Sequence, residues 1–278
     1  MKSGFSKTWA VIEVSAVTFG IIPLLTLGVY RLFPRFENWQ VQKLGFPFAV
    51  FVYGVMVAIP LFIILLRREH FAAYGLTFKN PRYHFDIAAT CFIPVALANL
   101  PFGLGVDHTR WGGALILAIV QSALLFVVAR VLRDKPSAAS LGLLGGVLLP
   151  QLAAGGVAGK ALVSFLTYAL FVGFGEEILY RGYVHSRLNA AFGKPFSFQG
   201  VAFGWGTLIT ALIFGLTHVG ILRWILGMSD AATWAWGFWT FFGGLVFAYV
   251  REKSGSILAP ALLHGLPQAI ATVALLFF

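Results

Sequence analysis

Long runs of apolar residues, separated by short polar segments, make up most of the chain. Each run is about 20 residues long, the length that an α-helix needs to cross the hydrocarbon core of a bilayer. The runs predict spanning helices at 9–30, 46–66, 86–104, 112–132, 141–158, 161–183, 201–222, 232–250 and 257–277. The fifth run is short, rich in glycine and interrupted by Pro150, so it is a span, a re-entrant segment or an interfacial helix. The pattern therefore predicts an all-α, polytopic membrane helix bundle with eight or nine transmembrane helices.

The composition agrees with a membrane bundle and changes how the net charge is interpreted. Hydrophobic residues make up 59% of the chain and charged residues only 11%, whereas a soluble domain is about one quarter charged. The formal net charge is +10, but the Lys and Arg residues lie between the apolar runs and form no basic domain. This distribution argues against a nucleic-acid partner. If there are nine spans, most of the Lys and Arg residues lie on the same side of the membrane as the N-terminus. This distribution predicts a cytoplasmic N-terminus. We expect the membrane to be a bacterial plasma membrane.

No linker or internal repeat divides the chain, so we expect one integral-membrane domain over residues 1–278. Residues 1–158 have the character of generic N-terminal spans. Nearly all the unusual polar chemistry lies in residues 160–277.

Three glutamates lie inside apolar runs, where a charged group costs about 2.5–3.5 kcal/mol. They are Glu13, Glu176 and Glu177. On an α-helix, Glu177 and Arg181 are four residues apart and can pair on one face. Glu176 lies about 100° round the helix from Glu177, so it is available as a general base. The alternative is that these three side chains form one structural ion network.

Two later runs carry polar side chains with helical spacing. Phe214 and His218 are four residues apart, as are His264 and Gln268, and Pro267 lies within the second pair. Each histidine alone is explained as an interhelical hydrogen-bonding residue. Together with the first motif, these runs supply carboxylates, a guanidinium, two imidazoles and an amide, a set that can activate water and stabilise an oxyanion.

The three motifs resemble those of a known family. "EEILYR" (176–181), "FGLTH" (214–218) and "HGLPQ" (264–268) are similar to the E-E-x-x-x-R, F-x-x-x-H and H-x-x-x-N motifs of the CAAX-processing endopeptidase and bacteriocin-processing (CPBP, Abi-type) glutamic intramembrane proteases. The resemblance covers about residues 160–277. It implies a catalytic core there and cleavage of a membrane-anchored or prenylated peptide within the bilayer.

The resemblance also implies a role for each motif residue. Glu176 and His218 would activate the attacking water, and His264 would lie near the oxyanion. Glu177, Arg181 and Phe214 would support them. Gln268 stands where the family has asparagine, and its extra methylene puts the reach of this oxyanion contact in question.

Alternatives remain at this point. Glu176, His218 and His264 are also a possible zinc ligand set, although the chain has no H-E-x-x-H helix, so we favour a mechanism without a cofactor. The buried acids, with Glu13, could instead serve a proton-coupled transporter. A catalytically silent scaffold or immunity protein with a protease-like core is the third possibility, and the Gln268 substitution favours it.

Overall fold

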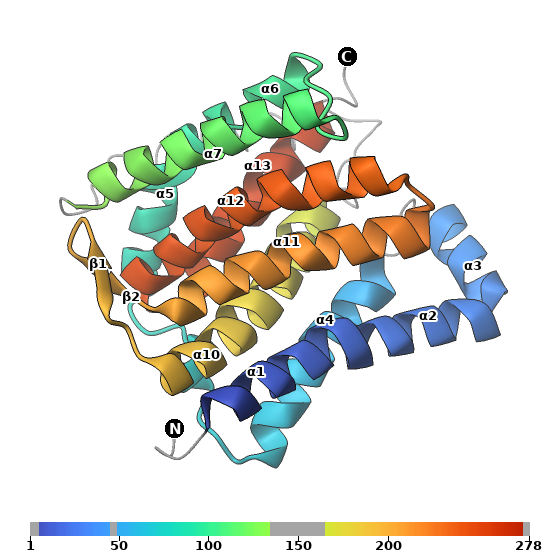
Figure 1. Cartoon of the computed structure of the whole chain (residues 1–278), viewed down its shortest axis with the longest axis horizontal. Coiled ribbons are helices and arrows are strands. Elements are labelled where there is room, and N and C mark those ends of the chain that lie inside the picture. Colours follow the sequence, from blue (N-terminus) through green and yellow to red (C-terminus); the bar gives the residue numbers. More distant parts are fainter. Residues whose placement is uncertain (1–5, 45–48, 134–164, 275–278) are drawn as a thin grey trace.

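The computed structural model describes residues 6–44, 49–133 and 165–274, and this part of the chain is helical apart from one short hairpin (Figure 1). The all-α prediction is therefore confirmed, while the predicted span at 141–158 lies outside the described residues. The N-terminal elements are α1 (Lys7–Ser15), η1 (Ala16–Ile21), α2 (Ile22–Leu32), α3 (Pro34–Leu44), α4 (Ala49–Leu66), η2 (Phe71–Tyr74), α5 (Pro81–Leu97), α6 (Leu100–Gly103) and α7 (Trp111–Val131). The C-terminal elements are η4 (Thr167–Gly175), η5 (Ile178–Val184), α10 (His185–Phe192), β1 (Phe196–Phe198), β2 (Val201–Phe203), α11 (Trp205–Leu226), α12 (Asp230–Ser254) and α13 (Leu258–Ala274).

Three helical stretches among the described residues are long and apolar enough to cross a membrane: Lys7–Leu32, Pro81–Phe102 and Trp111–Val131. Shorter apolar helices cover Phe51–Leu66 and Trp205–Gly220. The prediction of eight or nine transmembrane helices stays a prediction.

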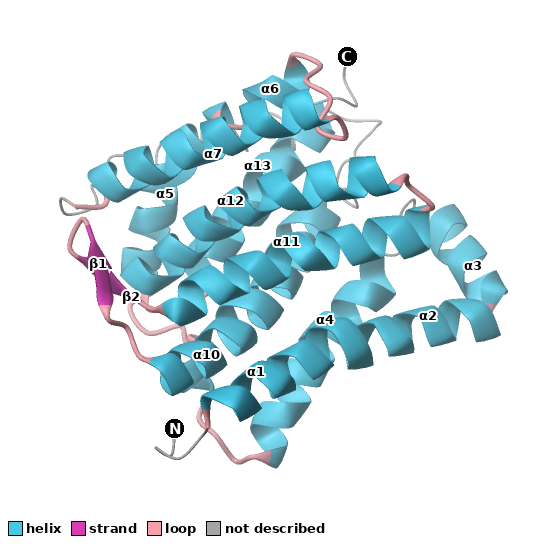
Figure 2. Ribbon diagram, in the orientation of Figure 1, coloured by secondary structure: helices cyan, strands magenta, loops and turns pink. Residues whose placement is uncertain are grey.

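One predicted span begins differently in the structure. The first residues of the run 201–222 form β2, which pairs with β1 in an antiparallel hairpin (Figure 2). Gln199 and Gly200, with φ of 49° and 78°, make the turn, since a tight hairpin turn favours left-handed backbone at both central positions. Because the run 201–222 is apolar throughout, its sequence did not distinguish the strand β2 from the helix that follows. Helix α11 begins only after β2.

The polar connection 67–84 is only partly a loop. It contains η2 and the first turn of α5. Pro81 opens α5, as is common for proline, because the first helical residue needs no intrahelical N–H bond. The helix thus starts before the apolar run that predicted it.

Helices α7, α12 and α11 pack side by side in one layer, and α13 packs against α5 and η4 behind them (Figure 1). α1 and α2 run in line along one edge, where α1 contacts α10 and α2 contacts α4. One apolar core lies among α5, α7, α12 and α13, and a second lies among α1–α2, α4, η5, α10 and α11. Both cores combine N-terminal and C-terminal elements.

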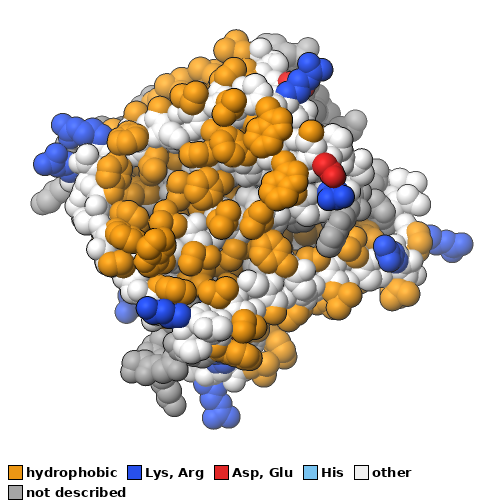
Figure 3. All heavy atoms as spheres, viewed as in Figure 1, with side chains coloured by type: hydrophobic (Ala, Val, Ile, Leu, Met, Phe, Trp, Pro, Cys, Tyr) orange, Lys and Arg blue, Asp and Glu red, His pale blue; other side chains and the backbone are white. Residues whose placement is uncertain are grey.

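The outer face over α7, α12 and α11 is largely hydrophobic, and Lys and Arg side chains lie around its edges (Figure 3). Large apolar side chains exposed on these helices include Ile119 and Phe126 of α7 and Trp234 of α12. Water would disfavour so broad an apolar surface, whereas lipid tails solvate it.

Candidate active site

The helix that carries the two adjacent glutamates is π-helical on both sides of them. Glu176 and Glu177 lie between η4 and η5, and the helix continues into α10. π-helical segments occur often at functional sites because the wider turn redirects side chains. The run at 161–183 predicted a helix here but gave no sign of the π geometry.

Glu177 is the most enclosed acid of the site. The side chains of Glu177 and Arg181 are both 0% exposed. Glu177 Oε1 accepts a hydrogen bond from Arg181 Nη1 at 2.8 Å and contacts His264 Nδ1 at 2.9 Å. The predicted pairing of Glu177 with Arg181 is confirmed. The contact of Glu177 with His264 joins this helix to α13.

The Arg181 guanidinium is held from other directions as well. Its Nη2 donates to the carbonyl oxygen of Gly244 in α12 at 3.2 Å. Its central carbon lies 4.5 Å from the centre of the Phe214 ring, within the range of a cation–π contact. Phe214 thereby supports the buried ion pair from α11.

Glu176 has different neighbours. Its Oε2 lies 3.7 Å from His264 Nε2, and its Oε1 accepts a hydrogen bond from the Tyr53 hydroxyl at 3.5 Å. Oε2 has no hydrogen-bond partner among the described residues. The two nitrogens of His264 therefore face the two glutamates, and Glu176 keeps one uncommitted oxygen.

His218 and Gln268 stand further from this centre. His218 Nδ1 lies 2.7 Å from the carbonyl oxygen of Phe214, and its ring packs edge-on against the Phe214 ring. Phe214 in turn lies 6.1 Å from His264, ring centre to ring centre. Within the described part of the chain, neither His218 nor Gln268 has a hydrogen bond or ion pair with Glu176. The catalytic roles of both stay predictions.

The zinc alternative can be compared with these positions. Across residues 6–44, 49–133 and 165–274, no group of three His, Cys, Asp or Glu side chains is placed to hold a metal ion. Glu176, His218 and His264 thus do not form a ready ligand set, and we derive no step through a metal.

Two aromatic residues at the site were missed in the sequence. Tyr53 of α4 contacts Glu176, and Phe247 of α12 stacks on His264 with 4.6 Å between ring centres. Both lie in apolar runs rich in aromatic residues, so neither their type nor their spacing distinguishes them.

Small residues let the two site helices approach each other. A Cβ on Gly173 would lie 2.6 Å from the Ala261 carbonyl oxygen, and one on Gly265 would lie 2.6 Å from the Tyr168 carbonyl oxygen. The backbones of η4 and α13 are therefore nearly in contact, which places His264 beside the glutamates.

An apolar cavity of about 120 Å³ lies between η1, α2, α4, η5 and α11. Its lining includes Met56, Leu179, Tyr180 and Thr217. Tyr180 lies four residues after Glu176, and its hydroxyl is 2.8 Å from Thr217 Oγ1. The cavity thus starts about one helical turn from the carboxylate.

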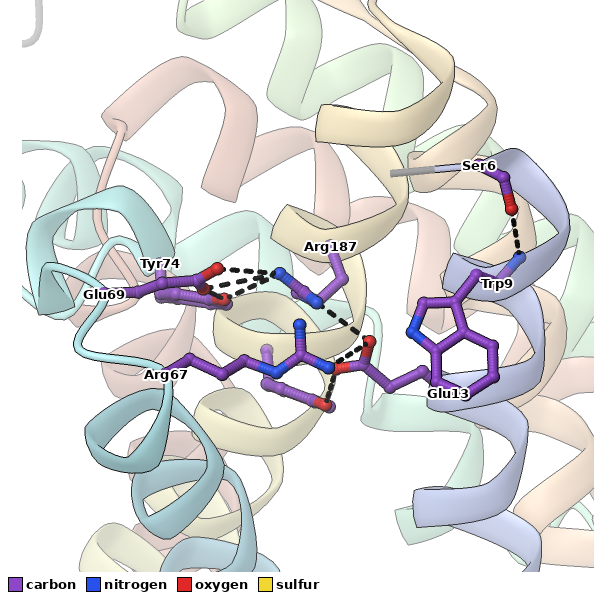
Figure 4. A network of polar contacts seen from close by, with 8 residues as sticks. Ser6, Trp9, Glu13, Arg67, Glu69, Tyr74 and Arg187 are labelled. Atoms are coloured by element: carbon purple, nitrogen blue, oxygen red, sulfur yellow. Dashed lines mark hydrogen bonds and ion pairs between the residues drawn. The ribbon is translucent and has the colours of Figure 1, made fainter. Parts of the chain in front are cut away.

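A second buried charge network lies apart from this centre (Figure 4). Glu13 Oε2 of α1 pairs with Arg67 Nη2 at 3.0 Å and with Arg187 Nη2 of α10 at 2.8 Å. Glu13 also accepts a hydrogen bond from Tyr183. Arg187 pairs with Glu69 through Nη1 at 3.2 Å. Glu13 is therefore an anchor between the first helix and the C-terminal half.

The fold and this centre define a class: a helical membrane protein with a buried Glu–Glu–Arg–His cluster. Comparison with known families agrees. Residues 158–270 match the model described as type II CAAX prenyl endopeptidase Rce1-like, and the chain carries a domain of that CPBP family over those residues. The match confirms the resemblance seen in the three motifs and contains all of them. No curated protein and no solved structure matches the chain.

Proposed function

We propose that the protein is an intramembrane endopeptidase that hydrolyses a peptide bond with water activated by Glu176. The observation that carries this proposal is the position of Glu176 Oε2, buried, without a hydrogen bond among the described residues and 3.7 Å from His264 Nε2. A carboxylate oxygen beside an imidazole is suited to accept a proton from water. The family of residues 158–270 supports protease chemistry.

His264 lies between the two glutamates. Its Nδ1 is 2.9 Å from Glu177 Oε1, and its Nε2 is 3.7 Å from Glu176 Oε2. An N–H at Nε2 would be available to a developing oxyanion beside Glu176.

The proposed reaction then runs without a covalent enzyme intermediate. Water attacks the peptide carbonyl carbon while Glu176 takes one of its protons. The tetrahedral oxyanion is stabilised by His264. The C–N bond breaks, and the leaving amine takes the proton from Glu176. We assign His218 to orienting the water through Nε2, because its Nδ1 lies 2.7 Å from the Phe214 carbonyl oxygen and donates to it in that arrangement.

We propose a membrane-anchored substrate, with a prenylated CAAX-type peptide as the first candidate. The family is one of CAAX prenyl endopeptidases, and the cavity of about 120 Å³ beside Tyr180 has an apolar lining, which suits hydrophobic groups. We place the N-terminus in the cytoplasm on the basis of the Lys and Arg distribution.

The test uses the full chain purified into lipid nanodiscs with prenylated and unmodified membrane peptides. We expect wild-type protein to generate new peptide termini and Glu176→Gln to generate none. Activity lost on chelation and regained with zinc would contradict the metal-free mechanism. Proton flux in proteoliposomes without cleavage would favour a transporter, and neither activity would favour a silent scaffold.

A further inference from the structure

We infer that Tyr53 is a positioning residue for Glu176, an inference that rests on the proposed function. Its hydroxyl holds Oε1 of Glu176, and this leaves Oε2 to take the proton from water. The hydroxyl lies 3.5 Å from Oε1, at the long end of hydrogen bonding. Catalytic hydrogen bonds are often long before substrate binds and shorten in the reacting complex.

Tyr53 reaches the site from outside the family domain. It lies in α4, whereas the matched domain covers residues 158–270. Helix α4 packs against η4, the segment that leads into Glu176. The N-terminal half would thus contribute directly to the reacting carboxylate.

Gly175 fixes where the Tyr53 ring lies. A Cβ on Gly175 would be 3.0 Å from Tyr53 Cδ1 and 3.2 Å from Tyr53 Cβ. The ring therefore packs against the bare backbone one residue before Glu176. This contact is independent of the hydroxyl and gives a second way to disturb the same position.

The two oxygens of Glu176 consequently differ. Oε1 meets a neutral hydroxyl donor, and Oε2 faces the imidazole of His264. A donor to one oxygen favours the ionised carboxylate and restricts its rotation. The titratable groups around Glu176 are Tyr53 from α4, His264 from α13, and Glu177 and Tyr180 on its own helix. The Tyr180 hydroxyl is bonded to Thr217, so it does not replace that of Tyr53.

The principal variant is Tyr53→Phe, assayed in nanodiscs by kcat and KM across pH. We expect kcat to fall about tenfold with KM unchanged. Loss of this hydroxyl donor should also move the acid limb of the kcat profile to higher pH. The matched control is Tyr83→Phe, which removes a hydroxyl bonded to the Lys253 carbonyl at 3.4 Å and should change neither quantity.

Gly175→Ala is the second variant, because it displaces the ring while keeping the hydroxyl. We expect the same direction of change with a smaller amplitude. In the Tyr53→Phe background it should add little, since both changes act through one contact.

The outcomes separate this inference from the proposed function. Inactive wild-type protein, or active Glu176→Gln, would overturn the endopeptidase itself. If wild type cleaves, Glu176→Gln does not, and Tyr53→Phe keeps the wild-type acid limb, Tyr53 has no positioning role. If Tyr53→Phe does not fold, Gly175→Ala becomes the test. An acid limb of the kcat profile that is unshifted in Gly175→Ala would then overturn the inference.

Discussion

At the residue scale, two adjacent glutamates have unequal surroundings and therefore unequal tasks. Glu177 is fully enclosed, and one of its oxygens contacts both Arg181 and His264. Each glutamate has one oxygen without a hydrogen bond among the described residues. However, Glu176 is 8% exposed whereas Glu177 is 0% exposed, and the unpartnered oxygen of Glu176 lies 3.7 Å from His264 Nε2. The surroundings of Glu177 suit a structural role in the bundle, whereas those of Glu176 leave Oε2 able to react with water.

The matched variants Glu176→Gln and Glu177→Gln should separate these tasks. Glu177→Gln leaves the buried Arg181 without its carboxylate, so we expect a loss of about 3–5 kcal/mol in unfolding free energy. Glu176→Gln should unfold near the wild-type temperature while kcat falls at least about 100-fold. Thermal unfolding and peptide cleavage, measured on the same preparations, check both expectations. The reverse pattern would exchange the two roles.

The sequence predicted part of this centre. Spacing of four residues paired Glu177 with Arg181 and set Glu176 off that line, because helical geometry is local. Spacing along one helix could not predict contacts between helices. Only the motif resemblance implied that the helices carrying His218 and His264 lie beside the glutamates. Tyr53 and Phe247 had no such signal. Tyrosine and phenylalanine are common lipid-facing or core residues in apolar runs, and only the packing of α4 and α12 brings these two to the site.

At the element scale, the close approach of η4 and α13 sets the geometry of the site. Gly173 and Gly265 lie at this crossing, and each faces a carbonyl oxygen of the opposite backbone. His264 directly precedes Gly265, so any separation of the helices moves the imidazole relative to Glu177.

Gly265→Ala should therefore impair both stability and cleavage. A methyl group there would lie 2.6 Å from the Tyr168 carbonyl oxygen, which forces the backbones apart. We expect a loss of about 1–3 kcal/mol together with a clear drop in kcat. Gly112→Ala in α7 is the control, since a Cβ there has open space around it. Equal effects of the two substitutions would contradict the close-packing account.

A second contact between elements joins α10 to the end of α12, beyond the predicted spans. His185 Nε2 lies 3.0 Å from Glu252 Oε1, and Lys194 also pairs with Glu252. Burial would raise the pKa of Glu252, but its bonds to His185 and Lys194 outweigh this and lower the pKa to about 2. Burial lowers the pKa of His185, so at neutral pH its ring is uncharged and Lys194 supplies the positive charge.

Both shifts predict a protein that loses stability in acid. A lowered carboxyl pKa stabilises the fold above the ordinary value near 4.5, and this contribution disappears as pH falls toward 2. A lowered histidine pKa likewise penalises the fold once pH drops below the ordinary value of 6.5. We expect unfolding free energy to fall by about 1–3 kcal/mol between pH 7 and pH 4. Glu252→Gln should flatten part of this dependence in thermal unfolding; an unchanged slope would exclude the cluster as its source.

The sequence predicted most helices but not their details. Runs at 112–132 and 232–250 correspond to α7 and α12, because a long apolar run favours a buried or membrane helix. The hairpin of β1 and β2 escaped because its strands are only three residues each and one of them continues into an apolar run. The π-helical turns could not be predicted from the sequence. The run is apolar on every side of the helix, so it has no hydrophobic periodicity that would distinguish a π-helix from an α-helix.

At the scale of the whole molecule, ion pairs and shared cores bind the N-terminal helices to the family domain. Glu13 connects α1 to Arg187 of α10 and to Arg67 after α4 (Figure 4). In the sequence, Glu13 fitted a proton path only under the transporter alternative. Its pairing with two guanidiniums gives it a structural role that needs no transport.

Glu13→Gln should accordingly weaken the whole molecule. Arg187 is 2% exposed and would lose the carboxylate that its Nη2 contacts at 2.8 Å, so we expect a loss of about 3 kcal/mol in unfolding free energy. Asp230→Asn is the control, because Asp230 and Arg223 form an exposed pair, which contributes under about 1 kcal/mol. A Glu13→Gln protein with wild-type stability would show that α1 is held by apolar packing alone.

Water activation by Glu176 inside the membrane bundle can be tested in the native host. Membrane peptides from wild-type cells and from cells carrying Glu176→Gln would be compared by mass spectrometry of their N- and C-termini. We predict at least one processing product that is present with wild-type protein and absent with Glu176→Gln, while the variant accumulates to normal levels. Identical termini in both strains would contradict the account.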